Sequence, residues 1–433
     1  LDLRALAVLD PTIRPSGSAA GPARSARDIF LTGATGFLGA FLLRELLRET
    51  GARIHCLVRA ADPTEGMSRI QATLQKYSLW DERLSARIRP VPGDLARPLL
   101  GLSPERFDAL AATIGAIYHS AAEVSYIKPY AQHEAANVRG THEIIRLACR
   151  GRATPLHYVS TIAVFGHIGW FTGRRWIRED DDIDAGADHL HTDIGYSQSK
   201  WVAEKLVWLA KERGLPVTIF RPGFILGHSR TGAINESDFM CRMTKSCIQL
   251  GAFPDLPDQS KEIVPVDFVS RAIAHLSRKK SSPGKVFHLV PPPSQRLDLM
   301  SFFGLLRGKG YSLQRLPYGR WIDALLARIE VSGGDPLLPL LPMLTEPVQA
   351  GPLTRWELYR HMPTFACENT LAGLAGTAIA CPAMSAELLD TYLLYLARIG
   401  FLEAPPRGPV PKAIESRPQR GDPQAPQSWR RVV

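Results

Sequence analysis

Tyr196 and Lys200 are the two residues of this sequence whose types and spacing best suit proton transfer. They lie in the stretch GYSQSK, and on a helix their spacing puts both side chains on one face, one turn apart. A free phenol has a pKa of about 10, and a nearby cation favours the phenolate form. The pair therefore predicts a general acid at Tyr196, made more acidic by the ammonium of Lys200.

A hydroxyl earlier in the chain could hold the oxygen that receives this proton. Thr161 follows a predicted strand over residues 156–160, and its side chain can donate a hydrogen bond to a substrate oxygen. A tyrosine and a lysine at this spacing also occur by chance on surface helices. Their position after Thr161 and after a glycine-rich turn favours a catalytic site formed by Thr161, Tyr196 and Lys200.

The glycine-rich turn near the start of the chain is typical of a nucleotide site. The sequence TGATGFLG directly follows a predicted strand over residues 28–32 and opens a predicted helix over residues 37–49. Glycine lets the backbone approach a pyrophosphate, and the first N–H groups of the helix attract the anion. The spacing is GxxGxxG rather than GxGxxG, and the alternative is a structural glycine turn. The expected lining residues are Thr32, Gly33, Thr35, Gly36, Phe37, Leu38 and Gly39.

The end of the second predicted strand, over residues 53–58, discriminates between two dinucleotides. An NAD site usually has an acidic residue there, which accepts hydrogen bonds from ribose hydroxyls. This chain has Arg59 instead, and a guanidinium pairs with a 2′-phosphate but cannot accept those bonds. Arg69 could join it from the next helix. We therefore predict NADPH as the cofactor; the alternative is that both arginines are surface charges.

Residues after the other predicted strands add candidate cofactor contacts. Asp94 could accept a hydrogen bond from the adenine amine, or it could only stabilise a turn. Small residues after the fourth strand would let the backbone approach the cofactor, and the backbone after the sixth strand could meet the nicotinamide. Besides Asp94, these candidates are Leu95, Ser120, Ala121, Ala122, Pro222 and Gly223.

The elements that must position these residues alternate between strands and helices. Helical patterns include residues 37–49, 131–149 and 197–211. Short apolar strands separated by helices predict a parallel sheet covered on both faces, the Rossmann-type doubly wound α/β fold. The strands are expected at residues 28–32, 53–58, 88–92, 116–119, 156–160, 217–220 and 286–290.

Composition shifts divide the chain into four predicted segments. Residues 1–27 read as a linker, and residues 28–290 as the nucleotide-binding domain, with substrate-side insertions at about 222–262. Helical patterns dominate residues 291–404 and predict a smaller, mostly helical substrate-binding subdomain there. Residues 405–433 are rich in proline, arginine and glutamine, which predicts a disordered tail.

Overall composition excludes several classes of protein. Hydrophobic residues make up 45% and charged residues 22%, as in soluble globular proteins. No signal peptide and no uninterrupted apolar stretch of roughly 18 residues is visible, so we expect a cytoplasmic protein without a membrane span. The six cysteines lack CxxC spacing, which predicts buried thiols rather than a disulfide framework or a metal site. A net charge of +10 suits an acidic partner, or only a solvated basic tail.

Taken together, the motifs resemble the extended short-chain dehydrogenase/reductase superfamily. The resemblance covers residues 28–290 and is closest to the terminal thioester reductase domains of nonribosomal peptide and polyketide synthetases, and to the reductase part of carboxylic acid reductases. GYSQSKWVAE is the most discriminating stretch. The matching stretches are TGATGFLG, LVRA, GDL, HSAAEVSY, NVRGT, YVSTIAVFG, GYSQSKWVAEKLV, RPG and VPVDFV.

The resemblance implies NADPH-dependent reduction of an acyl or peptidyl thioester on the phosphopantetheine arm of a carrier protein domain. It implies catalytic roles for Thr161, Tyr196 and Lys200, and it places Asn137 at the cofactor site as a structural or relay residue. It also implies that residues 1–27 join the domain to a preceding carrier. We expect a monomer that binds neither nucleic acid nor a membrane.

Three other functions fit parts of the sequence. A fatty acyl-CoA reductase would share the chemistry. A nucleotide-sugar epimerase or dehydratase would normally hold NAD, and Arg59 argues against it. A non-catalytic NADPH sensor would not need the intact set of Thr161, Tyr196 and Lys200. Related non-reducing proteins lack the tyrosine, so Tyr196 favours reduction.

Overall fold

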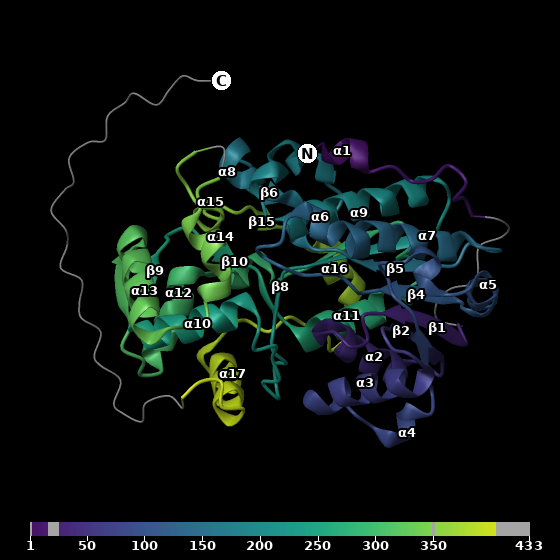
Figure 1. The fold of residues 1–433 in the computed structure, drawn as a ribbon, viewed down its shortest axis with the longest axis horizontal. Helices are drawn as coiled ribbons and strands as arrows, with labels where there is room; N and C mark the ends of the chain where they lie inside the picture. Colours follow the sequence, from purple (N-terminus) through teal and green to yellow (C-terminus); the bar gives the residue numbers. More distant parts are fainter. Residues whose placement is uncertain (1, 16–25, 349–350, 404–433) are drawn as a thin grey trace.

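A parallel sheet of seven strands forms the centre of the computed structural model, which describes residues 2–15, 26–348 and 351–403 (Figure 1). The strand order is β12-β7-β5-β4-β1-β2-β3, with every neighbouring pair parallel. The predicted Rossmann-type fold is confirmed. The strands are β1 (Asp28–Thr32), β2 (Arg53–Val58), β3 (Ile88–Pro92), β4 (Ala116–His119), β5 (Leu156–Val159), β7 (Val217–Pro222) and β12 (Val286–Leu289).

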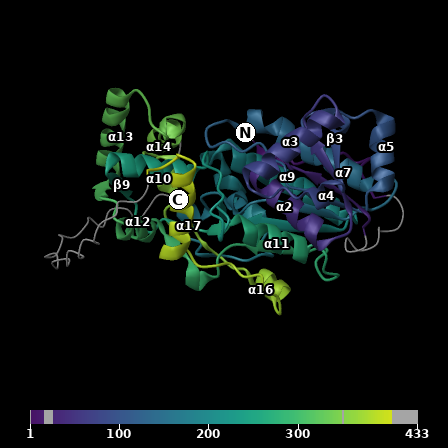
Figure 2. The ribbon, with the colours of Figure 1, turned by 90° about the horizontal axis from the view of Figure 1, so that it is seen from below.

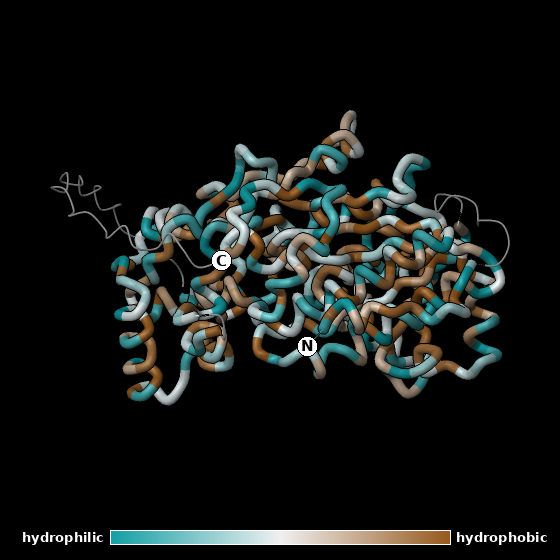
Figure 3. The backbone as a smooth tube through the Cα atoms, turned by 90° about the horizontal axis from the view of Figure 1, so that it is seen from above, coloured by the Kyte–Doolittle hydropathy of each residue, from teal (hydrophilic) through white to brown (hydrophobic). Residues whose placement is uncertain are grey.

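Helices cover both faces of this sheet (Figures 1 and 2). One face carries α2 (Phe37–Glu49), α3 (Pro63–Lys76) and α11 (Val266–Leu276), with α2 packed against both α3 and α11. The other face carries α5 (Pro104–Thr113), α7 (Gly140–Cys149) and α9 (Gly195–Glu212), with α7 in contact with both others. Figure 3 shows hydrophobic segments running through the interior between these layers. Burial of this apolar surface is the main force that holds the layers together.

Local sequence signals set several helix ends. Asp62 and Ser103 accept hydrogen bonds from first-turn N–H groups, and each is followed by a proline that suits the first helical position. Asp238 caps α10 (Phe239–Leu250) in the same way, and Gly251 ends that helix in the left-handed conformation. These caps fix where α3, α5 and α10 begin or end.

The predicted helix over residues 131–149 is confirmed as helical throughout, but the chain forms three successive helical segments there. These are α6 (Tyr130–His133), a π-helical turn (Glu134–Arg139) and α7. A π turn accommodates an extra residue within a helical path, and such turns often occur at functional sites. The turn contains Asn137, so its irregular geometry orients a predicted site residue.

A second, mostly helical part lies beside one end of the sheet domain, at the left of Figure 1. It combines α10 with segments after residue 297 and includes the parallel pair β9 (Ala252–Asp255) and β14 (Gln314–Pro317). Its α16 (Glu368–Leu374) returns to pack against α11 and β12. The other helices are α12 (Leu299–Gly308), α13 (Tyr318–Ser332), α14 (Leu341–Thr345), α15 (Arg355–Leu358) and α17 (Ala386–Arg398).

Short elements connect the two parts. Strand β8 (Phe224–Leu226) pairs with β11 (Ile263–Pro265), and β10 (Ser260–Lys261) pairs with β13 (Leu297–Asp298). The remaining short elements are α4 (Glu82–Ser85), α8 (Ile168–Thr172), β6 (Trp176–Ile177) and β15 (Thr364–Phe365).

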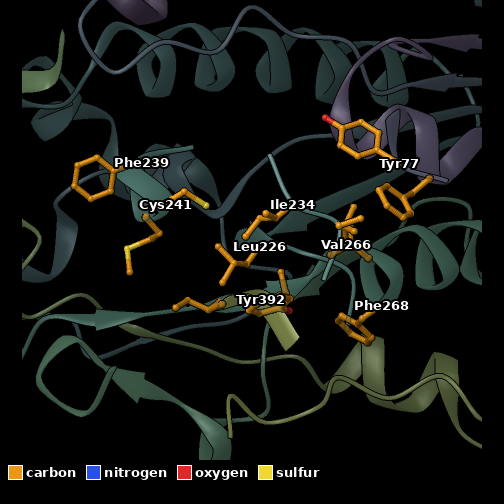
Figure 4. Packing of buried hydrophobic residues seen from close by; sticks show 14 of the residues in the cluster. Tyr77, Leu226, Ile234, Phe239, Cys241, Val266, Phe268 and Tyr392 are labelled. Carbon is orange, nitrogen blue, oxygen red and sulfur yellow. The ribbon is translucent and has the colours of Figure 1, made fainter. Parts of the chain in front are cut away.

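Both parts share one hydrophobic core. Figure 4 shows Leu226, Phe239, Val266 and Tyr392 within the same buried cluster, although they come from the strands, helices and C-terminal segment of different parts. The helical part is therefore packed onto the sheet domain rather than only tethered to it. The predicted tail, residues 405–433, lies outside the described residues.

The start of the chain packs against the domain. Leu3 in α1 (Leu3–Leu6), Leu9 and Ile13 are buried. The guanidinium of Arg213, which follows α9, donates hydrogen bonds of 2.6–2.9 Å to the carbonyls of Leu9, Asp10 and Ile13. Within the segment predicted to be a linker, residues 2–15 therefore follow a fixed path along the catalytic helix.

All six cysteine side chains are buried, as the sequence predicts. Burial raises the pKa of each of these thiols above its ordinary value. Among the described helices, none combines the length and the apolar character needed to cross a bilayer.

Candidate functional site

The glycine-rich turn lies between β1 and α2, where the order of the strands reverses. Gly33 has a φ of +86°, and a Cβ there would lie 2.9 Å from the backbone nitrogen of Ala121. A Cβ on Gly39 would lie 1.8 Å from the carbonyl oxygen of Gly33. The backbones of the turn, the loop after β4 and α2 therefore approach one another as only glycine allows. This crevice at the ends of parallel strands is where such folds bind nucleotides.

The surroundings of this turn suit an anionic dinucleotide. Gly36 caps α2 without any side-chain hydrogen bond, so the N–H groups of Phe37, Leu38 and Gly39 are available to a phosphate. Across the crevice, Thr32 accepts a hydrogen bond from the N–H of Ala121 at 3.1 Å. The buried hydroxyl of Ser120 next to it has no hydrogen-bond partner among the described residues. These groups form a cradle with unused donors, which a bound nucleotide can occupy.

The two predicted phosphate-binding arginines lie together at the end of β2. Arg59 and Arg69 are both exposed, and the guanidinium of Arg69 donates a hydrogen bond to the carbonyl oxygen of Arg59. Oε1 of Glu65 lies 3.9 Å from Nη1 of Arg69. The structure therefore brings the two cations together beside the strand end from which the sequence argument started.

The other predicted cofactor residues divide between turns and close backbone contacts. Asp94 accepts a hydrogen bond from the N–H of Ala96 at 2.9 Å, which is the turn-stabilising alternative for one of its oxygens. Leu95 packs closely on Gly140. A Cβ added to Gly140 would lie 2.5 Å from the side chain of Leu95. Pro222 ends β7, and a Cβ on Gly223 would lie 2.2 Å from the carbonyl of Glu262.

The proposed catalytic residues meet at the ends of β5 and α9. Thr161 follows β5 and accepts a hydrogen bond from the N–H of Ala163 at 3.1 Å. Its hydroxyl also lies near enough to the phenol of Tyr196, in the first turn of α9, to lower the pKa of that phenol in part. Lys200 lies one turn further along the same helix and is only 2% exposed. The structure therefore brings Thr161 and Tyr196 together, with Lys200 buried one helical turn further along α9.

The electrostatics of the pair differ from the prediction. Burial raises the pKa of Tyr196 to about 12, and the contact with Thr161 opposes this rise only in part. Burial also lowers the pKa of Lys200 to about 7, so part of its positive charge is lost at neutral pH. Its Nζ donates hydrogen bonds of 2.6 Å to the hydroxyl of Tyr158 and 2.8 Å to the carbonyl of Val159, not to Tyr196. The expectation that Lys200 acidifies Tyr196 is therefore wrong for this geometry.

Asn137 ties the loop after β4 to the catalytic helix. Its side-chain N–H groups donate to the carbonyl of Glu123 and the hydroxyl of Ser199, both at 2.9 Å. Its side-chain oxygen accepts from the N–H of Glu123 at 2.7 Å. Both of its donors are engaged, so of the two roles implied by the family, these bonds support the structural one.

A buried ion pair that sequence reasoning missed lies under the site. Glu204 in α9 and Arg221 in β7 are fully buried, with N–O distances of 2.6–3.3 Å. Glu204 also accepts a hydrogen bond from Ser160 at 2.5 Å, next to Thr161. The only signals were a glutamate four residues after Lys200 and the arginine of the RPG stretch, and neither indicates burial.

The helical part also reaches the catalytic helix. The hydroxyl of Tyr359 donates to Asp193 at 2.8 Å, three residues before Tyr196. The ammonium of Lys261 lies 4.1 Å from the ring centre of Trp356. These contacts place residues 356–359 next to the first turn of α9. Within the described ranges, no group of three or more histidine, cysteine or acidic residues could hold a metal ion.

Comparisons with known proteins agree with this geometry. A family model described as male sterility protein, a nucleotide-binding family, matches residues 31–273. The crystal structure of the terminal R domain of the myxalamid PKS-NRPS pathway is 44% identical with a TM-score of 0.81, covering 93% of this chain and 99% of that one. A reductase domain of a nonribosomal peptide synthetase from Mycobacterium tuberculosis is 27% identical with a TM-score of 0.73, covering 93% and 100%.

The parallel sheet, the glycine cradle and the tyrosine at the strand ends define an oxidoreductase that uses a nicotinamide cofactor. The chain belongs to the family of terminal reductase domains of nonribosomal peptide and polyketide synthetases. Among curated relatives, the aldehyde reductase lnaA of Aspergillus flavus is 42% identical over 85% of this chain. The matched region spans 36% of the length of that relative, so the similarity covers only one part of the relative.

Proposed function

We propose that this chain uses NADPH to release an acyl or peptidyl group, as an aldehyde, from the phosphopantetheine arm of a carrier protein domain. The observation that carries the proposal is the meeting of Thr161 and Tyr196, with Lys200 behind them, at the strand ends of the glycine-cradle crevice. The relatives named above support the same reaction class. Reduction of the aldehyde to an alcohol would use the same residues a second time.

The residues divide the chemistry as follows. When bound, the reduced nicotinamide supplies hydride to the thioester carbonyl carbon. Thr161 and Tyr196 donate hydrogen bonds to the oxygen on which negative charge develops. A pKa of about 12 keeps Tyr196 protonated at neutral pH, so it can give its proton to the more basic alkoxide oxygen. The resulting thiohemiacetal separates into the aldehyde and the carrier thiol, while Lys200 binds ribose hydroxyls of the cofactor.

The proposed partner is an acyl or peptidyl carrier domain, with residues 1–27 as the segment that leads to it. The net charge of +10 favours an acidic carrier. We propose residues 28–290 as the nucleotide-binding domain and residues 291–404, together with α10, as the substrate side. The proposed setting is the cytoplasm, with the chain as a monomer.

Acyl-S-pantetheine and NADPH are the reagents that test the proposed reaction. We expect loss of absorbance of the reduced nicotinamide together with formation of an aldehyde, or of an alcohol with two equivalents of NADPH consumed. The measurement is nicotinamide absorbance combined with product analysis. Conversion of a nucleotide sugar without net cofactor consumption would favour the epimerase alternative, and NADPH binding without turnover of any thioester would favour a sensor.

Arg59→Ala should weaken the preference for NADPH over NADH. The expected loss in the ratio of kcat/KM values is about 10- to 100-fold, because a hydrogen bond to a charged group contributes roughly 1.5–3 kcal/mol. Steady-state kinetics with both cofactors measures the ratio. Arg83→Ala, at an exposed arginine that bonds only Asp81, is the matched control. Equal use of both cofactors by the unaltered protein would contradict the proposal that Arg59 selects NADPH.

A further inference from the structure

Lys200 makes short buried hydrogen bonds to the strand beside its helix. Its Nζ donates to the hydroxyl of Tyr158 in β5 at 2.6 Å and to the carbonyl of Val159 at 2.8 Å. The Tyr158 hydroxyl presents a lone pair to the ammonium of Lys200, because a protonated amine can only donate hydrogen bonds. Near Tyr158, Thr141 in α7 lies 3.0 Å from Nε2 of His119, and Nδ1 of His119 lies 2.8 Å from the hydroxyl of Thr32. The side chains that make these contacts are each at most 2% exposed.

The groups beside Tyr158 carry no charge that could replace it as a partner of Lys200. The single hydroxyl proton of Thr141 is donated to the carbonyl of Asn137 at 2.6 Å, so its oxygen accepts from Nε2 of His119. Nδ1 of His119 then accepts from Thr32. Burial lowers the pKa of His119 to about 3, which keeps this imidazole neutral.

Other charged and titratable groups also face Lys200. Glu204, one turn along α9, favours the ammonium but is itself neutralised by Arg221. His119 in β4 is neutral, and Tyr196 lies on the same helix. Tyr158 in β5 is therefore the one side chain among the described residues that accepts a hydrogen bond from the ammonium, and the carbonyl of Val159 is the other acceptor.

We propose that Tyr158 is a positioning residue for the reaction, which fixes the place of Lys200 and favours its protonated form by accepting a hydrogen bond from its Nζ. This inference rests on the proposed role of Lys200 at the cofactor. Two of the three N–H donors of Lys200 are engaged by Tyr158 and Val159, and the third is left for a ribose hydroxyl.

Tyr158→Phe tests the inference, with Tyr118→Phe as the matched control. Both phenols are fully buried in adjacent central strands, and each makes a short side-chain hydrogen bond, but the one of Tyr118 goes to Ser277 at 2.8 Å. Nicotinamide fluorescence measures the affinity for NADPH at each pH. We expect tight binding below the pKa of Lys200 and weaker binding as the pH rises through that pKa. Because Tyr158→Phe removes an acceptor, we expect this loss at a pH about one unit lower than in Tyr118→Phe.

Catalysis provides a second readout. At pH 7.5, kcat/KM should fall about tenfold in Tyr158→Phe relative to Tyr118→Phe, since less of Lys200 is charged and its position is less fixed.

The outcomes separate this inference from the proposed reaction. Superimposable affinity profiles for Tyr158→Phe and Tyr118→Phe would overturn the positioning role, whether or not the chain turns over a thioester. A shifted profile in a chain that reduces no thioester would keep the positioning role and remove the proposed reaction. The 2′-phosphate of NADPH titrates equally in both variants, so the comparison cancels its contribution.

Discussion

Tyr196→Phe should abolish thioester reduction while NADPH still binds. The phenol lies near Thr161 at the strand ends, and its raised pKa keeps its proton in place for donation. A general acid contributes about 10²- to 10⁴-fold to a rate, so we expect kcat to fall by about 10³-fold. Single-turnover absorbance measurements, together with a fluorescence titration of NADPH, separate the chemical step from cofactor binding.

A nearby tyrosine supplies the control for this variant. Tyr130 is buried in α6, which packs against α9, and its hydroxyl has no hydrogen-bond partner among the described residues. Tyr130→Phe should leave kcat unchanged, because it removes an oxygen that bonds nothing. Full activity in Tyr196→Phe would show that the proton comes from elsewhere and would withdraw the catalytic assignment of Tyr196.

Glu204→Gln should strongly destabilise the fold. The substitution removes the only carboxylate that pairs with Arg221 within the described residues, and both side chains are fully buried. Breaking a buried ion pair from one side typically costs about 3–5 kcal/mol, because an uncompensated charge stays behind. The free energy of unfolding from urea denaturation, followed by tryptophan fluorescence, measures the loss. Ser160 loses a charged acceptor as well, so the loop that carries Thr161 should loosen.

Two further variants test whether the unpaired charge of Arg221 causes this loss of stability. Glu212→Gln, at an exposed carboxylate at the end of the same helix, should have little effect on stability. The double variant Glu204→Gln with Arg221→Met should be more stable than Glu204→Gln alone, because no buried charge lacks a partner. A double variant as unstable as the single one would assign the loss to packing rather than to the stranded guanidinium.

The sheet and the glycine cradle could be predicted from the sequence because their signals are local. Each strand is a short apolar run, and the expected strand ends differ from the observed ones by at most two residues. The close approach of Gly39 to Gly33 follows from residue types alone, since any side chain would collide there. The spacing of Tyr196 and Lys200 likewise fixes their relative position on one helix.

Interactions between distant segments could not be predicted in this way. The sequence places Lys200 near Tyr196, but the ammonium turns to Tyr158, which lies on a strand 42 residues earlier. Glu204 and Arg221 look like surface charges in a sequence, although the fold buries both. The π turn around Asn137 adds one residue to a helical path, a change too small to disturb the apolar periodicity.

The burial of the cysteines has a consequence for the proposed reaction. A thiolate exchanges readily with a thioester, so an exposed cysteine near the site would become acylated in place of the substrate carbonyl being reduced. Here every cysteine sulfur is inside the core, and burial raises the pKa of each thiol. The folded chain therefore offers the thioester of the proposed reaction no competing cysteine thiolate.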